Sequence, residues 1–419
     1  MAEEAPRRSY EVPRIDQIKR VDAQGRAKLG KSLLGQALYI HQTAEHPVAG
    51  QAYVVVTDHV DEAYLKPLRR LLEFRKGRLL VYQDLGDLVE NDSARGKLRA
   101  DLKAADARFV ALAPRKKSFR ENVVLAFLDV ASSLDEDAEL DVFPGWLVAG
   151  DAESFVRLID QTIAFRPSGV KGLKPFTLCQ VSAQEIRSQQ KTCIMDDYFE
   201  NLGIKMPSLS VRIRAPGITR EVRSAVGDPD DRVIGAMGGG RLLPGLPSQS
   251  EAALEQASLL MIYGHGAPGR ICALSLDAFQ EVDFSGKMVL CGACFSAMPE
   301  KSDFPLLQRG PGGGPVNQQA GRFAERMVSQ GAVAVLAHMR LSDGFPSVFP
   351  VFESLMQGLS VGESSQRLLN AAIQRVNLPR GQFCLKPEQR GQRSAQGRRN
   401  ALLWIMVGDP ALQLVEVAE

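Results

Sequence analysis

A histidine and a cysteine each follow an apolar run of the sequence, at the point where the run ends. His265 comes directly after ASLLMIYG (257–264), and Cys294 comes directly after KMVLCGA (287–293). If these runs are neighbouring strands of a parallel sheet, their carboxyl ends meet at one edge and bring the two side chains together. Imidazole titrates near neutral pH and can take the thiol proton, which leaves a nucleophilic thiolate. The pair therefore predicts a site for nucleophilic catalysis.

Small residues surround both side chains. Gly264 and Gly266 flank His265 and allow the backbone to turn sharply. The backbone N–H of Gly266 is then free to point at a developing oxyanion, beside the N–H of Cys294. A single buried histidine or cysteine is more often a structural residue. Two of them after matching strands favour a catalytic site.

The elements that must position this pair alternate along the chain. In the first half we expect strands at 52–57, 78–85, 108–114 and 141–149, and helices at 62–77, 93–105 and 151–165. In the second half we expect strands at 257–264, 287–293, 332–337 and 402–408, and helices at 320–330 and 361–376. Alternation of this kind predicts an α/β fold with a parallel sheet and right-handed crossovers.

The stretch Arg166-Pro167-Ser168-Gly169 indicates a break between two units. We expect an N-terminal arm and helix over 1–50, an N-terminal α/β subdomain over 51–168 and a C-terminal catalytic subdomain over 169–419. Within the C-terminal subdomain, the Gly/Pro-rich stretch 309–319 and the basic stretch 386–399 are expected to be solvated loops.

Composition excludes several classes of protein. In 419 residues, 45% are hydrophobic and 24% are charged, which excludes a disordered chain. The net charge of +2 gives no reason to expect binding to nucleic acid or to a membrane surface. Six cysteines are too few for a disulfide framework, so we expect reduced thiols. The first residues lack the apolar core of a secretory signal, and we expect a cytoplasmic protein.

The arrangement of the two strands resembles the signature of caspase-fold cysteine peptidases, and within that group the gingipain-type peptidases. Three further segments are similar to that family: AGRFAERMVSQGAVAVLA (320–337), the Gly-Asp-Pro segment WIMVGDPALQL (404–414), and the strand and helix of 141–165. The resemblance covers most of residues 50–415. It implies a caspase-like three-layer αβα sandwich and hydrolysis of a protein or peptide substrate, with no required cofactor.

The resemblance also implies roles for single residues. His265 would be the general base and acid and Cys294 the nucleophile, with the amides of Gly266 and Cys294 forming the oxyanion hole. Caspase-fold peptidases select mainly on the side chain before the cut. One wall of that pocket would be HMRLSDG (338–344), which includes Met339, Arg340 and Asp343.

The sequence does not decide whether that pocket carries a positive or a negative charge. A desolvated Arg340 would favour an acidic substrate side chain, and a desolvated Asp343 would favour a basic one. The resemblance slightly favours a basic side chain, paired with Asp343 or with an acid from 135–141. The acidic run LDEDAELD (134–141) could also hold a structural Ca²⁺ through Asp135, Asp137 and a carbonyl oxygen.

Other functions compete with the peptidase. Cys291 and Cys294 form a C-x-x-C motif, which could be a redox pair. The same fold could belong to a catalytically silent interaction protein. Residues 25–32, GRAKLGKS, match the phosphate-loop pattern, but the segment before them is too polar for the buried strand that such a loop needs.

Overall fold

The computed structural model describes two long blocks of the chain and a set of shorter pieces. The described residues are 18–21, 27–29, 52–137, 139–169, 172–181, 208–213, 219–224, 232–236, 246, 248–264, 266–267, 270–271, 274–300, 302–303, 322–340, 342, 345–389 and 392–416. Residues 31–42, whose apolar rhythm predicts the helix within 1–50, lie outside them, as do the stretch 309–319 and most of the phosphate-loop pattern at 25–32.

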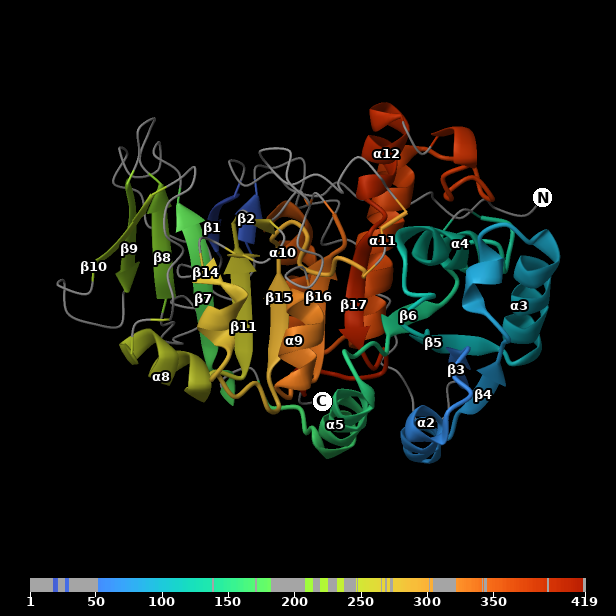
Figure 1. The fold of residues 1–419 in the computed structure, drawn as a ribbon, viewed down its shortest axis with the longest axis horizontal. Coiled ribbons are helices and arrows are strands. Elements are labelled where there is room, and N and C mark those ends of the chain that lie inside the picture. Colours follow the sequence, from blue (N-terminus) through green and yellow to red (C-terminus); the bar gives the residue numbers. More distant parts are fainter. Residues whose placement is uncertain are drawn as a thin grey trace.

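A twelve-stranded sheet runs through the whole molecule (Figure 1). Its strand order is β10-β9-β8-β7-β11-β15-β16-β17-β6-β5-β3-β4. Neighbours are parallel from β8 to β16 and again from β17 to β4, and the direction reverses between β16 and β17. β17 is thus a central strand, with the C-terminal half of the sheet on one side and the N-terminal half on the other.

The strands of this sheet include every strand expected from the sequence. Their bounds are β3 Ala52–Thr57, β4 Arg78–Val81, β5 Ala107–Ala113, β6 Phe143–Trp146, β7 Pro175–Val181, β8 Ser208–Ile213, β9 Thr219–Ser224, β10 Arg232–Ala236, β11 Leu259–Tyr263, β15 Met288–Cys291, β16 Ala334–His338 and β17 Trp404–Gly408. Smaller sheets are formed by β1 Ile18–Val21 with β2 Ala27–Leu29, and by β12 Gly266–Ala267, β13 Arg270–Ile271 and β14 Leu274–Ser275.

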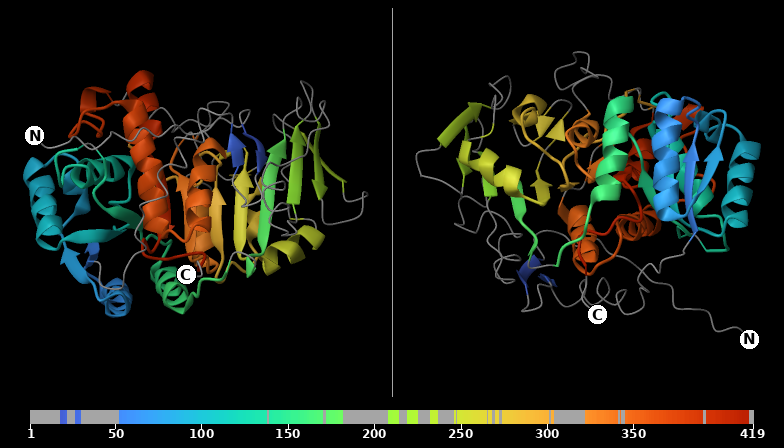
Figure 2. Two further views of the ribbon diagram at one scale, coloured as in Figure 1. Left: turned by 180° about the vertical axis from the view of Figure 1, so that it is seen from behind. Right: turned by 90° about the horizontal axis from the view of Figure 1, so that it is seen from below.

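Helices lie on both faces of the sheet and make a three-layer αβα sandwich (Figure 2). α5 contacts both α2 and α9 in one layer, and α10 packs against α11 in the other. The α-helices are α2 Glu62–Arg75, α3 Asp92–Ala104, α4 Glu121–Ala131, α5 Ala152–Ala164, α8 Ser248–Gln256, α9 Phe323–Ser329, α10 Phe345–Met356, α11 Val361–Val376 and α12 Arg393–Asn400. Short 3₁₀ helices are η3 Leu85–Leu88, η5 Leu276–Phe279 and η8 Pro387–Gln389.

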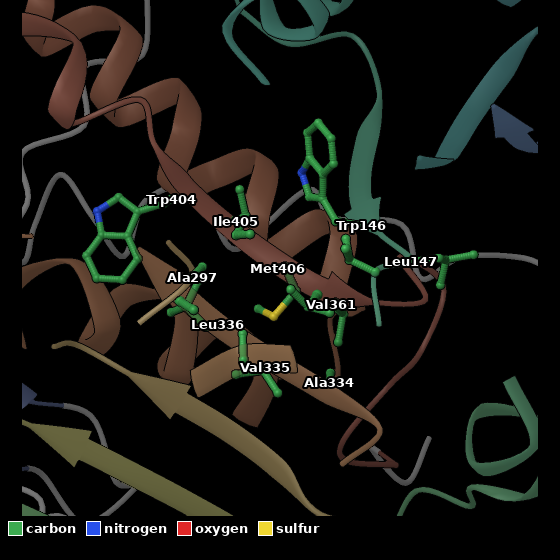
Figure 3. Close-up of a cluster of buried hydrophobic side chains, with 14 of the residues drawn as sticks. Trp146, Leu147, Ala297, Ala334, Val335, Leu336, Val361, Trp404, Ile405 and Met406 are labelled. Carbon is green, nitrogen blue, oxygen red and sulfur yellow. The ribbon is translucent and has the colours of Figure 1, made fainter. Parts of the chain in front are cut away.

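Apolar side chains fill the junction where the two halves of the sheet meet (Figure 3). Leu336 of β16, Met406 of β17 and Trp146 of β6 are all buried there. Each fully buried side chain of this size contributes about 1.5–3 kcal/mol relative to an exposed one. The core therefore continues across the junction and holds both halves together.

A buried ionic cluster adds to the same junction. The carboxylate of Asp409, directly after β17, accepts hydrogen bonds from Tyr53 Oη at 2.9 Å and from Arg75 Nε at 2.8 Å. Tyr53 comes from β3 and Arg75 from the last turn of α2. The Gly-Asp-Pro segment thus connects the C-terminal strand to the N-terminal half.

Several parts of the chain differ from what the sequence predicts, among them the strands β7 to β10 and the helices α8 and α10, none of which was expected. The stretch 386–399 is not a solvated loop: it contains η8 and most of α12, and Arg399 is only 4% exposed. The Arg399 side chain donates to the carbonyl oxygens of Phe383 and Gln382 at 2.6 and 2.7 Å, which satisfies a buried guanidinium. The sequence analysis also contained no helix at α4, whose residues are all buried.

No helix among the described residues has both the length and the apolar character needed to cross a membrane.

Candidate functional site

Cys294 lies three residues beyond the end of a buried parallel strand. β11 and β15 pair in register, with Ile262 opposite Cys291, and the N–H of Gly292 still donates to the carbonyl of Ile262 at 2.8 Å. The chain then turns away from the sheet at Phe295, whose φ of +58° is the left-handed conformation. The turn leaves the Cys294 side chain half-buried.

Gly266 lies directly against the backbone of Cys294. A Cβ atom built on Gly266 would overlap the Cys294 carbonyl oxygen and would lie 2.9 Å from the Cys294 nitrogen. Only glycine permits this approach. The structure therefore brings together two of the residues that the sequence analysis selected.

His265 and Asp343 lie outside the described residues. Each has described neighbours in the chain, Gly264 and Gly266 for the histidine and Ser342 for the aspartate. Since Ile262 pairs with Cys291, His265 and Cys294 each lie three positions past a paired residue. The convergence of the two strand ends, on which the prediction of a site depends, is confirmed.

Ser342 contacts the sulfur of Cys294, and the sequence analysis did not select it. Its backbone N–H donates to Cys294 Sγ at 3.3 Å, and its hydroxyl oxygen lies 3.6 Å from the same sulfur. The hydroxyl donates a hydrogen bond to the carbonyl oxygen of Gly292 at 2.7 Å. Nothing in the sequence distinguishes Ser342 from other loop serines, because the contact depends on how β16 leads into this segment.

Met339 and Arg340, expected in a pocket wall, are both buried. The Arg340 guanidinium lies 3.8 Å from the carboxylate of Glu121, at the first residue of α4. Burial lowers the pKa of Arg340 to about 10, and the charge of Glu121 opposes this shift. Burial likewise raises the pKa of Glu121. The guanidinium of Arg340 therefore pairs with Glu121 at the start of α4.

The segment after Cys294 joins the two halves of the molecule. We call residues 295–300 and 302–303 the post-cysteine segment. Its Asp303 accepts from the backbone N–H of Asn122 at 3.0 Å, and its Ser302 hydroxyl donates to Glu121 Oε1 at 2.6 Å. At its start, the N–H of Phe295 donates to the carbonyl of Arg340 at 2.7 Å. The N-terminus of α4 is thus contacted by Arg340 and by the post-cysteine segment, and these two contact each other next to Cys294.

The acids of 135–141 lie at the other end of α4. Carboxylate oxygens of Asp135, Asp137 and Asp141 come within 4.8 Å of one another. Burial, with the neighbouring Asp135, raises the pKa of Asp141 to about 7. The eleven residues of α4 span about 16 Å, which separates the end near these acids from the end that contacts Arg340. The Ca²⁺ suggested for Asp135 and Asp137 stays a prediction.

Cys291 differs sharply from Cys294 in its surroundings. It lies within β15 with no exposed surface, and burial raises the pKa of its thiol to about 12. Cys291, Cys294 and Cys384 are free thiols in the part of the chain that the structure describes. A thiol as buried as Cys291 is poorly suited to exchange with an external disulfide.

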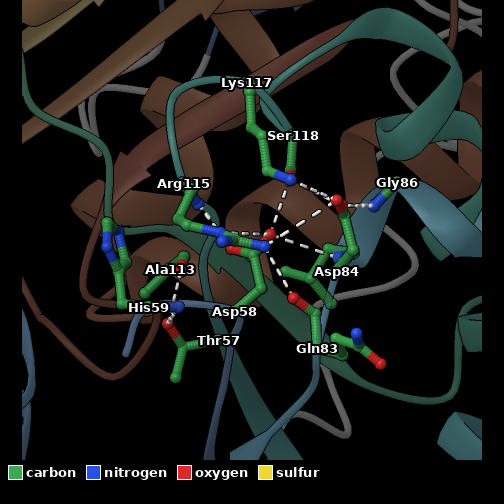
Figure 4. Close-up of polar contacts among 11 residues, drawn as sticks. Thr57, Asp58, His59, Gln83, Asp84, Gly86, Ala113, Arg115, Lys117 and Ser118 are labelled. Atoms are coloured by element: carbon green, nitrogen blue, oxygen red, sulfur yellow. Dashed lines mark hydrogen bonds and ion pairs between the residues drawn. The ribbon is translucent and has the colours of Figure 1, made fainter. Parts of the chain in front are cut away.

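A second polar cluster follows the strands of the N-terminal half (Figure 4). Asp58, directly after β3, accepts from the N–H of Arg115 at 2.6 Å, from the hydroxyl of Ser118 at 2.6 Å and from the N–H of Leu85 at 3.2 Å. Arg115 Nε also faces this carboxylate at 3.2 Å. The partners of Asp58 come from the segments that follow the neighbouring strands β4 and β5.

Comparison with solved structures finds the same fold in cysteine proteinases. The crystal structure of the Arg specific cysteine proteinase gingipain R (RgpB) matches with a TM-score of 0.54 and 14% identity, covering 88% of this chain and 80% of that chain. A complex of the pro- and mature domains of RgpB from Porphyromonas gingivalis matches with a TM-score of 0.51 and 15% identity, over 86% and 79%. No protein-family model and no curated protein matches the sequence.

These matches define the class of fold. The chain has the caspase-like αβα sandwich of the gingipains, as the resemblance in its sequence implied. At 14–15% identity the likeness concerns the fold alone.

Proposed function

We propose that this protein is a cysteine endopeptidase in which Cys294 and His265 act as a catalytic dyad on a protein or peptide substrate. The observation that carries the proposal is the contact of Gly266 with the backbone of Cys294. This contact brings the residue that follows His265 to the nucleophile, at the carboxyl ends of two paired strands. The gingipain fold supports the same reaction class.

The reaction follows from the chemistry of the two side chains. His265 takes the thiol proton, and the thiolate of Cys294 attacks the carbonyl carbon of the scissile bond. The amides of Gly266 and Cys294 stabilise the oxyanion that forms. The C–N bond then breaks, and the leaving amine takes its proton from His265. Water, deprotonated by His265, hydrolyses the resulting thioester and restores the thiol.

For specificity we propose a preference for a basic side chain before the cut. The fold neighbour is an Arg specific proteinase. In HMRLSDG (338–344) the charge of Arg340 is directed at Glu121, so Asp343 is the residue of this stretch to test for recognition of a basic side chain. Replacing Asp343 by Asn should weaken selection for Arg and Lys in a peptide library scanned at that position. An unchanged profile would contradict this assignment.

The central experiment compares three variants on a peptide library. Cys294→Ala and His265→Ala should each abolish hydrolysis. The double variant should be no worse, because the loss of one member of the dyad already removes the contribution of the other to the rate. Cys291→Ala is the matched control: it should keep full turnover per folded molecule, whereas a C-x-x-C redox protein would lose activity with either cysteine.

Complete absence of cleavage by correctly folded wild-type protein, across the library and at every pH tested, would contradict the peptidase. It would favour a catalytically silent interaction protein on the same fold. The expected cytoplasmic location stays a prediction.

A further inference from the structure

Ser342 presents three polar atoms to the sulfur of Cys294. Its N–H donates to Sγ at 3.3 Å, its hydroxyl oxygen lies at 3.6 Å, and its carbonyl oxygen lies at 3.8 Å. Distances of this size are hydrogen-bond contacts for sulfur, whose atomic radius exceeds that of oxygen. Three polar atoms of one residue therefore contact the sulfur that would attack the substrate.

The hydroxyl of Ser342 has two acceptors within reach. In the structure its proton is directed at the carbonyl oxygen of Gly292, at 2.7 Å. While Cys294 is a neutral thiol, the hydroxyl oxygen and the carbonyl of Ser342 can accept the S–H. When the thiol becomes a thiolate, the sulfur turns into a pure acceptor, and a charged acceptor attracts a donor more strongly than a neutral carbonyl does.

Hydrogen bonds hold two residues that precede Ser342. The N–H of Met339 donates to the carbonyl of Leu403, and the N–H of Arg340 donates to His338 Nδ1 at 3.0 Å. The carbonyl of Arg340 accepts the N–H of Phe295. The segment that leads to Ser342 is therefore fixed both to the chain that precedes β17 and to the turn that follows Cys294.

We propose that Ser342 is a further catalytic residue, whose hydroxyl rotates its proton from the Gly292 carbonyl to Cys294 Sγ when the thiol ionises. This inference rests on the proposed function, because it takes Cys294 as the nucleophile. The thiol proton goes to His265, and the O–H bond of Ser342 does not break. Together with its N–H, Ser342 then supplies two donors to the thiolate.

A structural role for the same hydroxyl makes a different prediction. If the hydroxyl only bridges to Gly292, its loss lowers stability and leaves the ionisation of Cys294 unchanged. If it rotates to the sulfur, its loss moves the ionisation of Cys294 to higher pH. The rate of alkylation of Cys294 by iodoacetamide measures the thiolate fraction directly and needs no substrate.

The experiment records this rate from pH 5 to 10 by mass spectrometry of the peptide that contains Cys294, with Cys294→Ala as the background. In Ser342→Ala the midpoint of the profile should move up by about one pH unit, since a hydrogen bond to an ionised group is worth roughly a factor of ten. Ser342→Thr, which keeps the hydroxyl, should stay close to wild type.

Ser118→Ala is the matched control for the loss of a buried serine hydroxyl. Ser118 donates to Asp58 in the N-terminal half, so this variant should lose stability without moving the midpoint. Equal midpoints for Ser342→Ala and wild type, or an equal shift in Ser118→Ala, would overturn the inference.

Hydrolysis by the same variants separates this inference from the proposed function. Ser342→Ala should be about tenfold slower at neutral pH and should recover at alkaline pH, with KM unchanged. If wild type cleaves no peptide but Ser342→Ala still shifts the alkylation midpoint, the peptidase proposal fails and the contact with the thiolate remains. If hydrolysis is found and the midpoint does not move, only the role of Ser342 fails.

Discussion

The two halves of the sheet end in polar clusters of opposite kinds. After β3 and β5 of the N-terminal half, Asp58 is surrounded by donors from Arg115, Ser118 and Leu85 (Figure 4). After β11 and β15 of the C-terminal half, the half-buried thiol of Cys294 has Gly266 and Ser342 as neighbours. The first cluster is made of charges that satisfy one another, and the second is made of small residues around one free thiol.

Under the proposed function, equivalent strand ends serve stability in the N-terminal half and chemistry in the C-terminal half. A buried charge is costly unless it is paired and hydrogen-bonded, so the N-terminal cluster is closed by its own side chains. A nucleophile needs room for a carbonyl group to approach, and glycine beside it provides that room. The clearest test of the comparison is to change each cluster and measure activity and stability separately.

The largest effect is expected at the C-terminal cluster. Gly266→Ala places a Cβ on the Cys294 carbonyl oxygen, so one of the two backbones must shift. A displacement of about 1 Å at a reacting group can cost roughly 100-fold in rate. We expect kcat/KM, measured per folded molecule, to fall by at least about that factor. Gly172→Ala, where the nearest atom would lie at 3.5 Å, is the control and should keep normal turnover.

The next effect concerns the contact between the halves. Glu121→Ala removes the carboxylate that faces Arg340 and accepts from Ser302. Breaking a buried ion pair costs about 3–5 kcal/mol of unfolding free energy. Because the Arg340 carbonyl holds Phe295, kcat should fall as well. Chemical denaturation and steady-state kinetics measure the two quantities.

Glu300→Ala is the control for that variant. Glu300 pairs with Lys116 across the same halves at 3.5 Å and with Arg322 at 3.2 Å, but its own side chain is 44% exposed. An exposed pair contributes at most about 1 kcal/mol. Similar losses for Glu121→Ala and Glu300→Ala would contradict the special position of Glu121.

At the N-terminal cluster, Asp58→Asn should lower stability and leave catalysis intact. The substitution removes the charge that faces Arg115 and turns one acceptor into a donor. We expect a loss of about 3 kcal/mol. Activity per folded molecule should equal that of wild type, as measured by active-site titration at low temperature. A selective loss of kcat would mean that the two clusters are not independent.

The smallest effect is a pH dependence of stability. His59, beside Asp58, stacks on Tyr64 with ring centroids 4.0 Å apart. Burial lowers the pKa of His59, and the charge of Asp58 opposes this shift. The unfolded chain therefore binds a proton more readily, and stability is lost as pH falls below about 6.5. In His59→Phe this loss should be smaller, as seen in melting temperatures at pH 5 and 8. An equal loss of melting temperature between pH 8 and pH 5 in the two proteins would contradict this prediction.

The sequence predicted most of these strands well because they are short apolar runs that are buried on both faces, whereas β4, at the edge of the sheet, is partly exposed. AYVVVT at β3 and the run at β15 are of this kind. α4 was missed because ENVVLAFLDVA is buried all around and shows no polar face. Residues 386–399 were assigned to a loop from their charge, whereas the guanidinium of Arg399 is satisfied by buried carbonyl groups.

The candidate site also has features that the sequence predicts and features that it misses. The pairing of β11 with β15 follows from apolar patterns, and so does the approach of Gly266 to Cys294. The contact of Ser342 with the sulfur, and that of Arg340 with Glu121, depend on long-range packing. No local pattern records which side chains of a loop meet across a sheet.

The central place of β17 has a consequence for the order of folding. The side chain of Asp409 meets that of Tyr53, 356 positions earlier in the chain. Contacts between such distant residues form late, because the loop that they close is long. During synthesis the N-terminal strands leave the ribosome long before β17 does. The nascent chain must therefore keep an apolar strand edge beside β6 unpaired until the residues of β17, Trp404–Gly408, have been made.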